Sequence, residues 1–376
     1  MTQTNLEEAV RQPNRLLNKN CENLIQGIIE GKIVPVLGRE HNLCDRPKIN
    51  QKPEFWQCDF SLNPPSCPSY PPTHRELAAY LIEYFTNHGA AHFDEIQFSY
   101  PFQGIESGKW KAEWADLQHV FQLLCDAESK VLATSELHRI LCDKNYRPNQ
   151  LHKSFALLPK VIRLTKPDAP MFPLIVTTSY DRMLEQAFEA AEEPFDLVYY
   201  SATGEKDDWF LHKTPEGIIH EIDNPNNYRR LSLKKRPVIL KVYGTVDQSI
   251  DADRLVISED DYIDFLSWRN TPDLLPTTLL KQLRRNQVLF LGPCSLSHWH
   301  QRVILHHIWP TRPFLKKSKW YAIQWDSEES DDIKESNDIN KKFWKKYNVD
   351  IQDISPEDFM NEFDEQIHSI IGGQGK

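Results

Sequence analysis

A short apolar run that ends in a polar turn and continues as a helical pattern is the feature that most constrains this fold. Residues 173–182 read PLIVTTSYDR, and the apolar residues that follow recur at helical spacing. Two later segments repeat the beginning of this arrangement, PVILKVYG at 237–244 and VLFLGPCSLS at 288–297. Buried parallel strands are apolar in this continuous way, and open α/β sheets bind ligands at the carboxyl ends of such strands. The sequence therefore predicts one site built from these loops.

Further apolar runs alternate with helical patterns along the chain. Runs at 33–37, 196–200 and 319–324 are typical of strands, and a last helical pattern covers about 356–370. This alternation predicts an α/β fold with a Rossmann-like, mostly parallel sheet of about six strands. We expect the central strands to end together at one edge of that sheet. These central strands cover residues 34–37, 174–177, 238–242 and 288–291.

A helical insertion interrupts the alternation at about 73–160. It contains amphipathic faces that begin at Leu77, Leu117 and Leu137. The proline-rich stretch before it, 48–72, lacks periodicity and predicts a long loop. We expect the insertion to cover one end of the sheet without forming an independent domain.

The chain has no internal repeat and no low-complexity linker that would divide it. The sequence therefore predicts a polar leader over 1–22 and a single α/β domain over 23–376. The first residues lack the charged and then apolar plan of a signal peptide. No apolar run approaches the ~20 residues that a membrane-spanning helix needs. We expect a soluble, cytoplasmic protein that does not bind membranes.

The charge balance argues against nucleic acid as the main ligand. The formal net charge is −10, whereas phosphate backbones favour strongly basic surfaces. Local basic runs occur at Arg229-Arg230 and at 234–236. Such short runs are more often solvated loop faces than binding surfaces, and we interpret them in that way.

The cysteines indicate a reducing compartment, because the seven of them form no regular framework. His41, Cys44, Cys58 and Cys67 do offer four soft metal ligands in one stretch. Structural zinc sites usually contain closely spaced cysteine pairs, and here only His41 and Cys44 are close together. Ordinary loop thiols are therefore preferred over zinc, and we expect no metal.

A glycine follows the first predicted strand. Gly38 would let backbone amides approach a pyrophosphate closely. The usual dinucleotide fingerprint G-x-G-x-x-G is absent, because Gly38 is followed by REHN. A plain tight turn explains an isolated glycine as well as a phosphate site does.

Taken together, these segments resemble the sirtuin-like family of bacterial NAD-consuming proteins, many of which belong to antiphage systems. The family loops read T-T-N-Y-D, K-x-H-G and L-F-L-G-Y-S-x-x-D-W. This chain has TTSYD at 177–181, KVYG at 241–244 and LFLGPCSLSHW at 289–299. The resemblance extends from about 24 to 363 and implies a sirtuin/DHS-like fold.

The resemblance also implies a nucleotide ligand, NAD or ADP-ribose. Some family members carry G-R-x-x-N-L-C-x-R-P after the first strand, and residues 38–47 fit that version. Arg39 or Arg46 would then supply charge for a phosphate, unless the arginine pairs with a local carboxylate such as Asp45. The positions implied to bind the cofactor are Gly38, Arg39, Asn42, Thr178, Asp181, Gly244, Gly292 and Ser295.

The catalytic positions of the family are all substituted. Ser179 replaces the family asparagine, Tyr243 the histidine base, and His298 the late aspartate. A phenol with a pKa of ~10 is a poor base at neutral pH, and a serine hydroxyl cannot reproduce the two-point grip of an amide. Loss of a general base typically costs a factor of about 10² to 10⁴ in rate.

Three hypotheses follow from these substitutions. The first is an NAD-binding or ADP-ribose-binding domain with degenerate catalytic residues, which acts as a regulatory or conflict-system module. The second is an active NAD glycohydrolase that uses a substitute base, with His41 and His298 as candidates. The third is a protein-interaction scaffold without a nucleotide. Protein partners and homo-oligomers are compatible with each of them.

Overall fold

The computed structural model describes most, but not all, of the chain. The described residues are 19–49, 52–59, 61–62, 66–87, 116–201, 209–246, 255–267, 275–292, 320–323, 342, 344–345, 348–352 and 354–373. Most of the predicted leader, and both Ser295 and His298, therefore lie outside the described residues.

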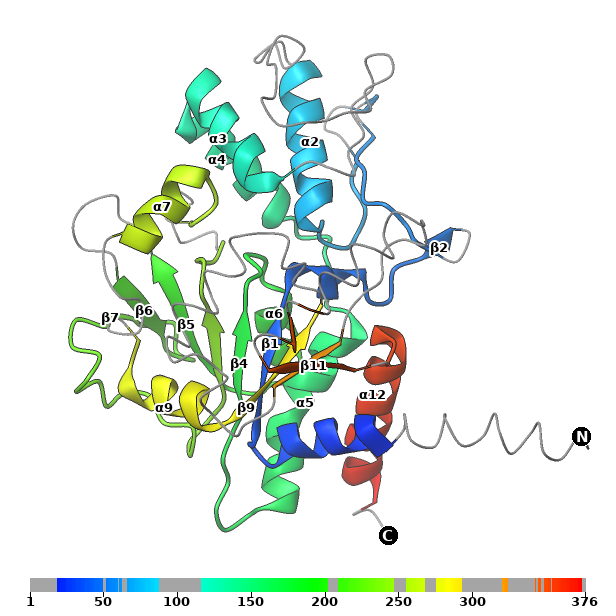
Figure 1. Ribbon diagram of the computed structural model, residues 1–376, viewed down its shortest axis with the longest axis vertical. Coiled ribbons are helices and arrows are strands. Elements are labelled where there is room, and N and C mark those ends of the chain that lie inside the picture. Colours follow the sequence, from blue (N-terminus) through cyan, green and yellow to red (C-terminus); the bar gives the residue numbers. More distant parts are fainter. Residues whose placement is uncertain are drawn as a thin grey trace, which may run out of the picture.

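A nine-stranded sheet forms the centre of the molecule, in the order β11-β10-β9-β1-β4-β8-β5-β6-β7 (Figure 1). All neighbours from β11 to β5 are parallel, and β6 and β7 are antiparallel additions at one edge. The prediction of an α/β fold with a mostly parallel sheet is confirmed. The sheet is larger than the expected six strands because it also includes this edge hairpin and β11. The strands are β1 Ile33–Leu37, β4 Leu174–Thr177, β5 Asp196–Ser201, β6 Trp209–Lys213, β7 Ile219–Glu221, β8 Val238–Lys241, β9 Gln287–Leu291, β10 Trp320–Ile323 and β11 Val349–Gln352.

Helices cover both faces of the sheet, which explains why its central strands are mostly apolar. In β1, Val34 and Val36 point into one apolar cluster, while Ile33 and Leu37 point into the other. The second cluster also holds the helix over residues 19–29. The labelled helices are α2 His74–Asn87, α3 Leu117–Ala127, α4 Lys130–Leu141, α5 Gln150–Thr165, α6 Met183–Ala190, α7 Glu259–Ser267, α9 Thr277–Arg285 and α12 Pro356–Gly372.

Helices α2, α3 and α4 of the predicted insertion lie together beyond one end of the sheet (Figure 1). Their apolar side chains, including Leu77 and Leu137, belong to the same cluster as Val36 of β1. Helix α5 begins inside the range predicted for the insertion, yet its Phe155 packs in the cluster on the other face. The cover is therefore shorter than the predicted 73–160, since α5 belongs to a layer of the sheet.

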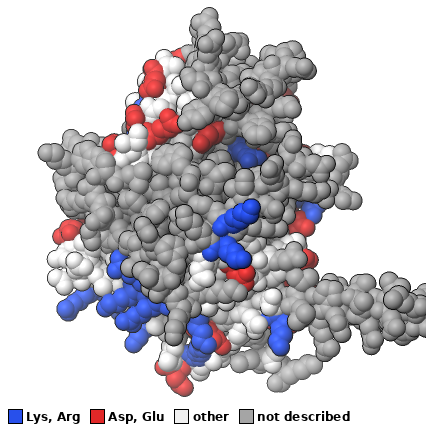
Figure 2. All heavy atoms as spheres, in the orientation of Figure 1, with Lys and Arg blue, Asp and Glu red and all other residues white. Residues whose placement is uncertain are grey.

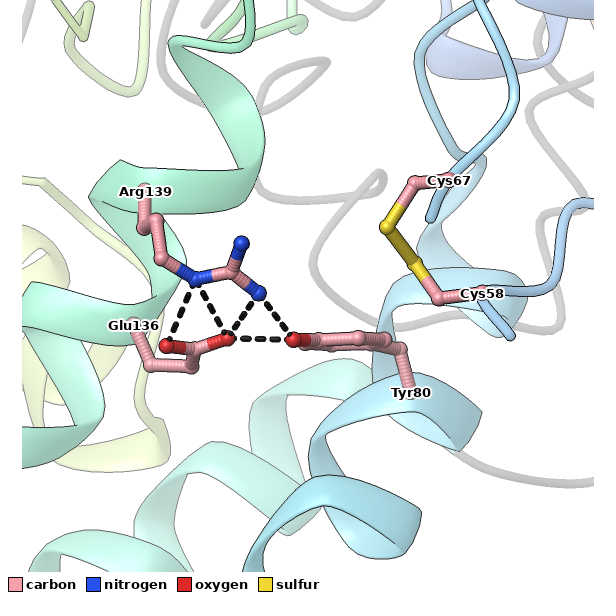
Figure 3. Close-up of a disulfide and its surroundings, with 5 residues drawn as sticks. All are labelled: Cys58, Cys67, Tyr80, Glu136 and Arg139. Carbon is pink, nitrogen blue, oxygen red and sulfur yellow. Dashed lines mark hydrogen bonds and ion pairs between the residues drawn. A yellow bond between two sulfur atoms is a disulfide. The ribbon is translucent and has the colours of Figure 1, made fainter. Parts of the chain in front are cut away.

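The loop between β1 and α2 contains a disulfide between Cys58 and Cys67. The expectation of ordinary loop thiols was wrong for these two residues, because the antiparallel bridge of Asp59 with Ser66 brings them together. Figure 3 shows the disulfide beside α2, near the place where Tyr80 of α2 bonds Glu136 and Arg139 of α4. The shorter segments of this loop are η1 Arg39–Leu43, β2 Lys48–Ile49 and β3 Lys52–Pro53.

The basic runs lie away from the carboxyl ends of the strands. Lys and Arg side chains gather over α9 and over the loop after β7 (Figure 2). Arg229, Arg230, Lys234 and Lys235 are exposed in that loop, which leads into the beginning of β8. They therefore form a solvated face at the opposite edge of the sheet. None of the helices in the described ranges has the length and apolar character needed to cross a membrane.

Candidate functional site

The carboxyl ends of the four central strands β1, β4, β8 and β9 lie side by side. We call the side of the sheet on which these strands end the rim. Leu37 of β1 pairs with Thr177 of β4 on one side and with Leu291 of β9 on the other. Thr177 in turn pairs with Lys241 of β8. This register brings together the loops after β1, β4, β8 and β9, as the sequence predicted. Ser179 and Tyr243 consequently follow neighbouring strands at the same rim.

The rim has a topological switch point between β1 and β9. The strands on one side of β1 are β4, β8 and β5, whereas the chain later returns to build β9, β10 and β11 on the other side. In open α/β sheets, such a point forms a crevice in which ligands bind. The loops after β1 and β9 therefore form the walls of the expected binding site.

Gly38 and Gly292 are pressed together at this switch point. The Gly38 amide donates to the Leu291 carbonyl over 2.8 Å. A Cβ atom on Gly38 would lie 2.8 Å from the carbonyl oxygen of Gly292. Gly292 has a φ of +81°, and its own Cβ would lie 2.9 Å from the amide nitrogen of His41. Larger residues cannot occupy either position without movement of the backbone.

Arg39 places a buried positive charge directly beside these glycines. Its side chain is only 3% exposed, and its guanidinium carbon lies 3.5 Å from the centre of the Tyr180 ring. Nε donates to the Thr178 carbonyl over 3.3 Å, while Nη2 has no hydrogen-bond partner. Burial lowers the pKa of the guanidinium. No carboxylate among the described residues forms an ion pair with Arg39, so an anion bound here would be favoured.

Arg46 does not offer a phosphate site. Its side chain forms a buried ion pair with Glu76 of α2, with both carboxylate oxygens accepting. Its other hydrogen bonds go to the carbonyls of Asn42, Glu54 and Pro71. These contacts use all the N–H groups that a guanidinium carries. Arg46 therefore fixes the loop to α2, and its partner is Glu76 and not Asp45.

Asp181 is the centre of a buried hydrogen-bond network beneath the rim. Its carboxylate accepts hydrogen bonds from Asn42 Nδ2 over 3.0 Å, from Ser179 Oγ, and from the Met183 amide over 3.0 Å. Burial would raise the pKa of Asp181, but the fields of His41 and Lys241 and the Ser179 hydroxyl bring it below its usual range. Asn42 and Ser179 thus both bond Asp181, and the Asn42 bond ties the loop after β1 to the loop after β4.

Lys241 is a buried charge that was not among the predicted site residues. Its Nζ forms an ion pair with Glu185 of α6 over 2.8 Å and donates to the carbonyls of Tyr180 and Asp181. The ammonium therefore holds the loop after β4 in place from below. A lysine inside an otherwise apolar strand was the available signal, because a buried ammonium requires such partners.

Tyr243 lies in the aromatic core at the rim. Its side chain is 1% exposed, and its ring meets Tyr262 at 5.0 Å and Phe265 at 5.8 Å, measured between ring centres. Gly244, which follows it, has a φ of +96°, a conformation that favours glycine. The phenol therefore fills the space between the loop after β8 and helix α7.

His41 and His152 form a buried edge-to-face pair with ring centres 4.6 Å apart. His41 Nδ1 donates to the Gly38 carbonyl, and the Asn149 side chain donates to the His41 carbonyl over 2.8 Å. Burial lowers the pKa of both imidazoles, which favours their neutral forms. His41 therefore supports the loop after β1 from within the protein.

Glu40 lies over the glycine loop. One of its carboxylate oxygens is 3.2 Å from the position that a Cβ of Gly38 would occupy. The residue keeps part of its surface exposed, and burial of the rest raises the pKa of its carboxyl to about 7. The charge beside Gly38 thus changes in the physiological pH range.

A comparison with known protein families finds a match over part of the chain. A family model described as a SIR2-like domain matches residues 173–352. The matched range contains every strand from β4 to β11. Strand β1 precedes the match and lies between β4 and β9 in the sheet, so the loop with Gly38 and Arg39 completes the same rim. No curated protein matches this chain.

Proposed function

The chain is a member of the SIR2-like family through residues 173–352, and we propose that its rim binds NAD or ADP-ribose with little or no hydrolysis. Phosphates would lie at the switch point, against Gly38 and Gly292. Thr178, Asn42 and Asp181 would shape or line the same crevice, together with Ser295, which lies outside the described residues. The bound nucleotide would make the protein a regulatory or conflict-system module. Its partners would be other proteins or further copies of the chain.

The observation that carries this proposal is the environment of Arg39. A guanidinium buried to 3% exposure is costly unless its charge and its N–H groups are satisfied. Nη2 lacks a hydrogen-bond partner, and Arg39 directly follows Gly38, whose backbone packs against that of Gly292 at the switch point. A pyrophosphate supplies the charge and the acceptor oxygens that are missing.

Two observations support degenerate catalysis. The Ser179 hydroxyl bonds Asp181 and so has no hydrogen left to donate to a ribose or a water. Tyr243 occupies the position of the family base, but it is packed against Tyr262 and Phe265. A buried phenol there acts as a filler of space and not as a proton acceptor near neutral pH.

An active NAD glycohydrolase is the alternative, and it needs a substitute base. His41 is fully buried and packs edge-to-face against His152, so its imidazole is not accessible to solvent. His298, outside the described residues, is then the first candidate for that base. A scaffold that lacks a nucleotide is the second alternative. The buried Arg39 guanidinium argues against it, because its Nη2 has no hydrogen-bond partner.

Calorimetry with NAD and with ADP-ribose, run beside a sensitive assay of nicotinamide release, separates these functions. Binding of both ligands without release supports the proposed function. Release at a sustained rate supports the glycohydrolase, and absence of both binding and release supports the scaffold.

A further inference from the structure

A disulfide that thiol reagents can reach closes the loop between η1 and α2 (Figure 3). Cys58 is 4% exposed, whereas Cys67 keeps part of its surface exposed. Among the described cysteines, the four others are free thiols. We call the backbone on the two sides of the bond, residues 54–57 and 68–73, the stems of the disulfide loop.

Arg46 is bonded to both stems of the disulfide loop. Its Nη1 donates to the Glu54 carbonyl over 3.3 Å, and its Nη2 donates to the Pro71 carbonyl over 2.8 Å. The guanidinium carbon also lies 4.6 Å from the centre of the Tyr70 ring. The Tyr70 hydroxyl in turn donates to the Glu54 carboxylate over 3.1 Å, from one stem to the other. The disulfide and Arg46 therefore hold the same two stems together.

The same arginine is bonded to the rim. Arg46 Nε donates to the Asn42 carbonyl over 2.9 Å, and Asn42 Nδ2 donates to the Asp181 carboxylate over 3.0 Å. A second contact with the stems passes through Glu76, which pairs with Arg46 and accepts from the Trp56 amide over 2.7 Å. Neighbouring contacts thus lead from the stems of the disulfide loop to the network beneath the candidate nucleotide site.

We propose that this disulfide is a redox switch for the nucleotide site, which binds its ligand more tightly while the bond is closed. This inference rests on the proposed function. The closed bond restricts the stems to conformations that Arg46 can hold. When the bond opens, the stems gain freedom, and the loop that carries Arg39 and Asn42 is less fixed. A ligand must then order this loop on binding, which lowers the apparent affinity.

A dithiol opens the bond in two exchange steps. Its first thiolate attacks Sγ of Cys67, the more exposed partner, and the sulfur–sulfur bond breaks as Cys58 leaves and takes up a proton. The second thiolate of the reagent attacks the mixed disulfide, and Cys67 leaves and takes up a proton as well. The reagent is thereby oxidised to a disulfide, and the protein gains two thiols.

Calorimetry with NAD tests the switch on the full chain, before and after reduction with dithiothreitol. We expect the reduced wild type to bind NAD about 5- to 50-fold more weakly than the oxidised wild type. The double variant Cys58→Ser with Cys67→Ser should match the reduced wild type, with or without reductant. Cys125→Ser is the matched control, since Cys125 is a free thiol, and it should respond to reductant as the wild type does.

The outcomes separate this inference from the proposed function. A count of thiols before and after treatment shows whether the bond has opened. If the fully reduced wild type binds NAD as tightly as the oxidised protein or more tightly, the switch is overturned and the proposed function stands. A bond that dithiothreitol leaves closed in the folded protein overturns the switch as well. If neither form binds NAD, both fail.

Hydrogen exchange and linkage separate a switch from a general loss of stability. Reduction should speed exchange of the amides of His41, Cys44 and Arg46, which are bonded within the loop after β1, and leave those of β8 unchanged. Equally faster exchange in β8 would overturn the switch. Because coupling is reciprocal, saturating NAD should shift the equilibrium with dithiothreitol toward the disulfide by the same factor. An equilibrium that NAD does not move would overturn the proposal.

Discussion

Gly38 and Gly292 meet at the switch point of the sheet so closely that a Cβ on Gly38 would lie 2.8 Å from the Gly292 carbonyl oxygen. The two glycines follow β1 and β9, which are neighbours in the sheet although they are far apart in the sequence. Their contact brings the backbone of two loops to one point and leaves Arg39 beside it. This close backbone packing requires residues without side chains.

Gly292→Ala tests this close approach. At a φ of +81°, with a Cβ only 2.9 Å from the His41 amide nitrogen, alanine should lower the free energy of unfolding by about 3 kcal/mol or more. Gly217 is the control, because its φ is +83° and no atom lies within 4 Å of its Cβ position. Gly217→Ala should cost only about 1 kcal/mol. Equal losses in urea denaturation would show that the contact at the switch point is relaxed.

Arg39 and Arg46 should respond to substitution in opposite ways. Arg39→Met removes a buried charge that forms no ion pair among the described residues, so stability should change little while NAD and ADP-ribose bind at least about tenfold more weakly. Arg46→Met leaves Glu76 buried without its partner and should lower the free energy of unfolding by about 3–5 kcal/mol. Chemical denaturation and calorimetry measure both effects. Unchanged ligand binding in Arg39→Met would contradict the phosphate role.

Glu40 should make both stability and ligand binding depend on pH. Burial raises the pKa of its carboxyl from 4.5 to about 7 in the folded protein, so folding favours the protonated form. Relative to Glu40→Gln, the wild type should therefore lose stability as the pH rises from 4.5 to 7. Melting temperatures of the two proteins across this pH range test the prediction. A wild type that gains stability relative to Glu40→Gln as the pH rises would contradict it.

Protonation of Glu40 should also favour an anionic ligand, because the carboxyl lies beside Gly38. NAD affinity should fall as the pH increases through about 7, and Glu40→Gln should flatten that dependence. The nearby charges are those of Arg39, Arg75 and Glu76. A wild-type affinity that is constant across the range would place the phosphates elsewhere.

The disulfide should stabilise the loop before α2. Cys58 and Cys67 are separated by 9 positions, and closure of a loop of this size contributes about 2–3 kcal/mol in the chain-entropy model. Dithiothreitol should therefore lower the melting temperature of the wild type. The double variant Cys58→Ser with Cys67→Ser should melt low with or without reductant. A wild type that does not respond to reductant would mean that the bond contributes no stability.

Restoration of the family residues should restore catalysis if their loss explains weak activity. We expect Ser179→Asn with Tyr243→His to cleave NAD at a measurable rate, and each single change to do much less, because base and amide act in one transition state. Nicotinamide release is the measurement, and His298→Asp is the next change to add. A wild type already as fast as the double variant would instead indicate a substitute base.

Much of the rim was predictable from local patterns. Apolar runs that end in small or polar residues predicted β1, β4, β8 and β9, and the parallel arrangement followed from the helices between them. The disulfide between Cys58 and Cys67 was not predictable, because pairing of two loop cysteines depends on the path of the backbone between them. The number of strands in the sheet was underestimated for a different reason. Edge strands such as β7 are short and exposed, so they lack the apolar run that marks a buried strand.

The sequence by itself determined the fold class, the family and the order of the loops, because strand and helix periodicities are local properties of the chain. Tertiary structure alone decided the roles of the charged groups. Arg39 and Arg46 stand in the same motif, yet only Arg46 meets a carboxylate, that of Glu76 on α2. Whether a buried polar group is satisfied depends on neighbours that are distant in the sequence, and folding alone brings them together.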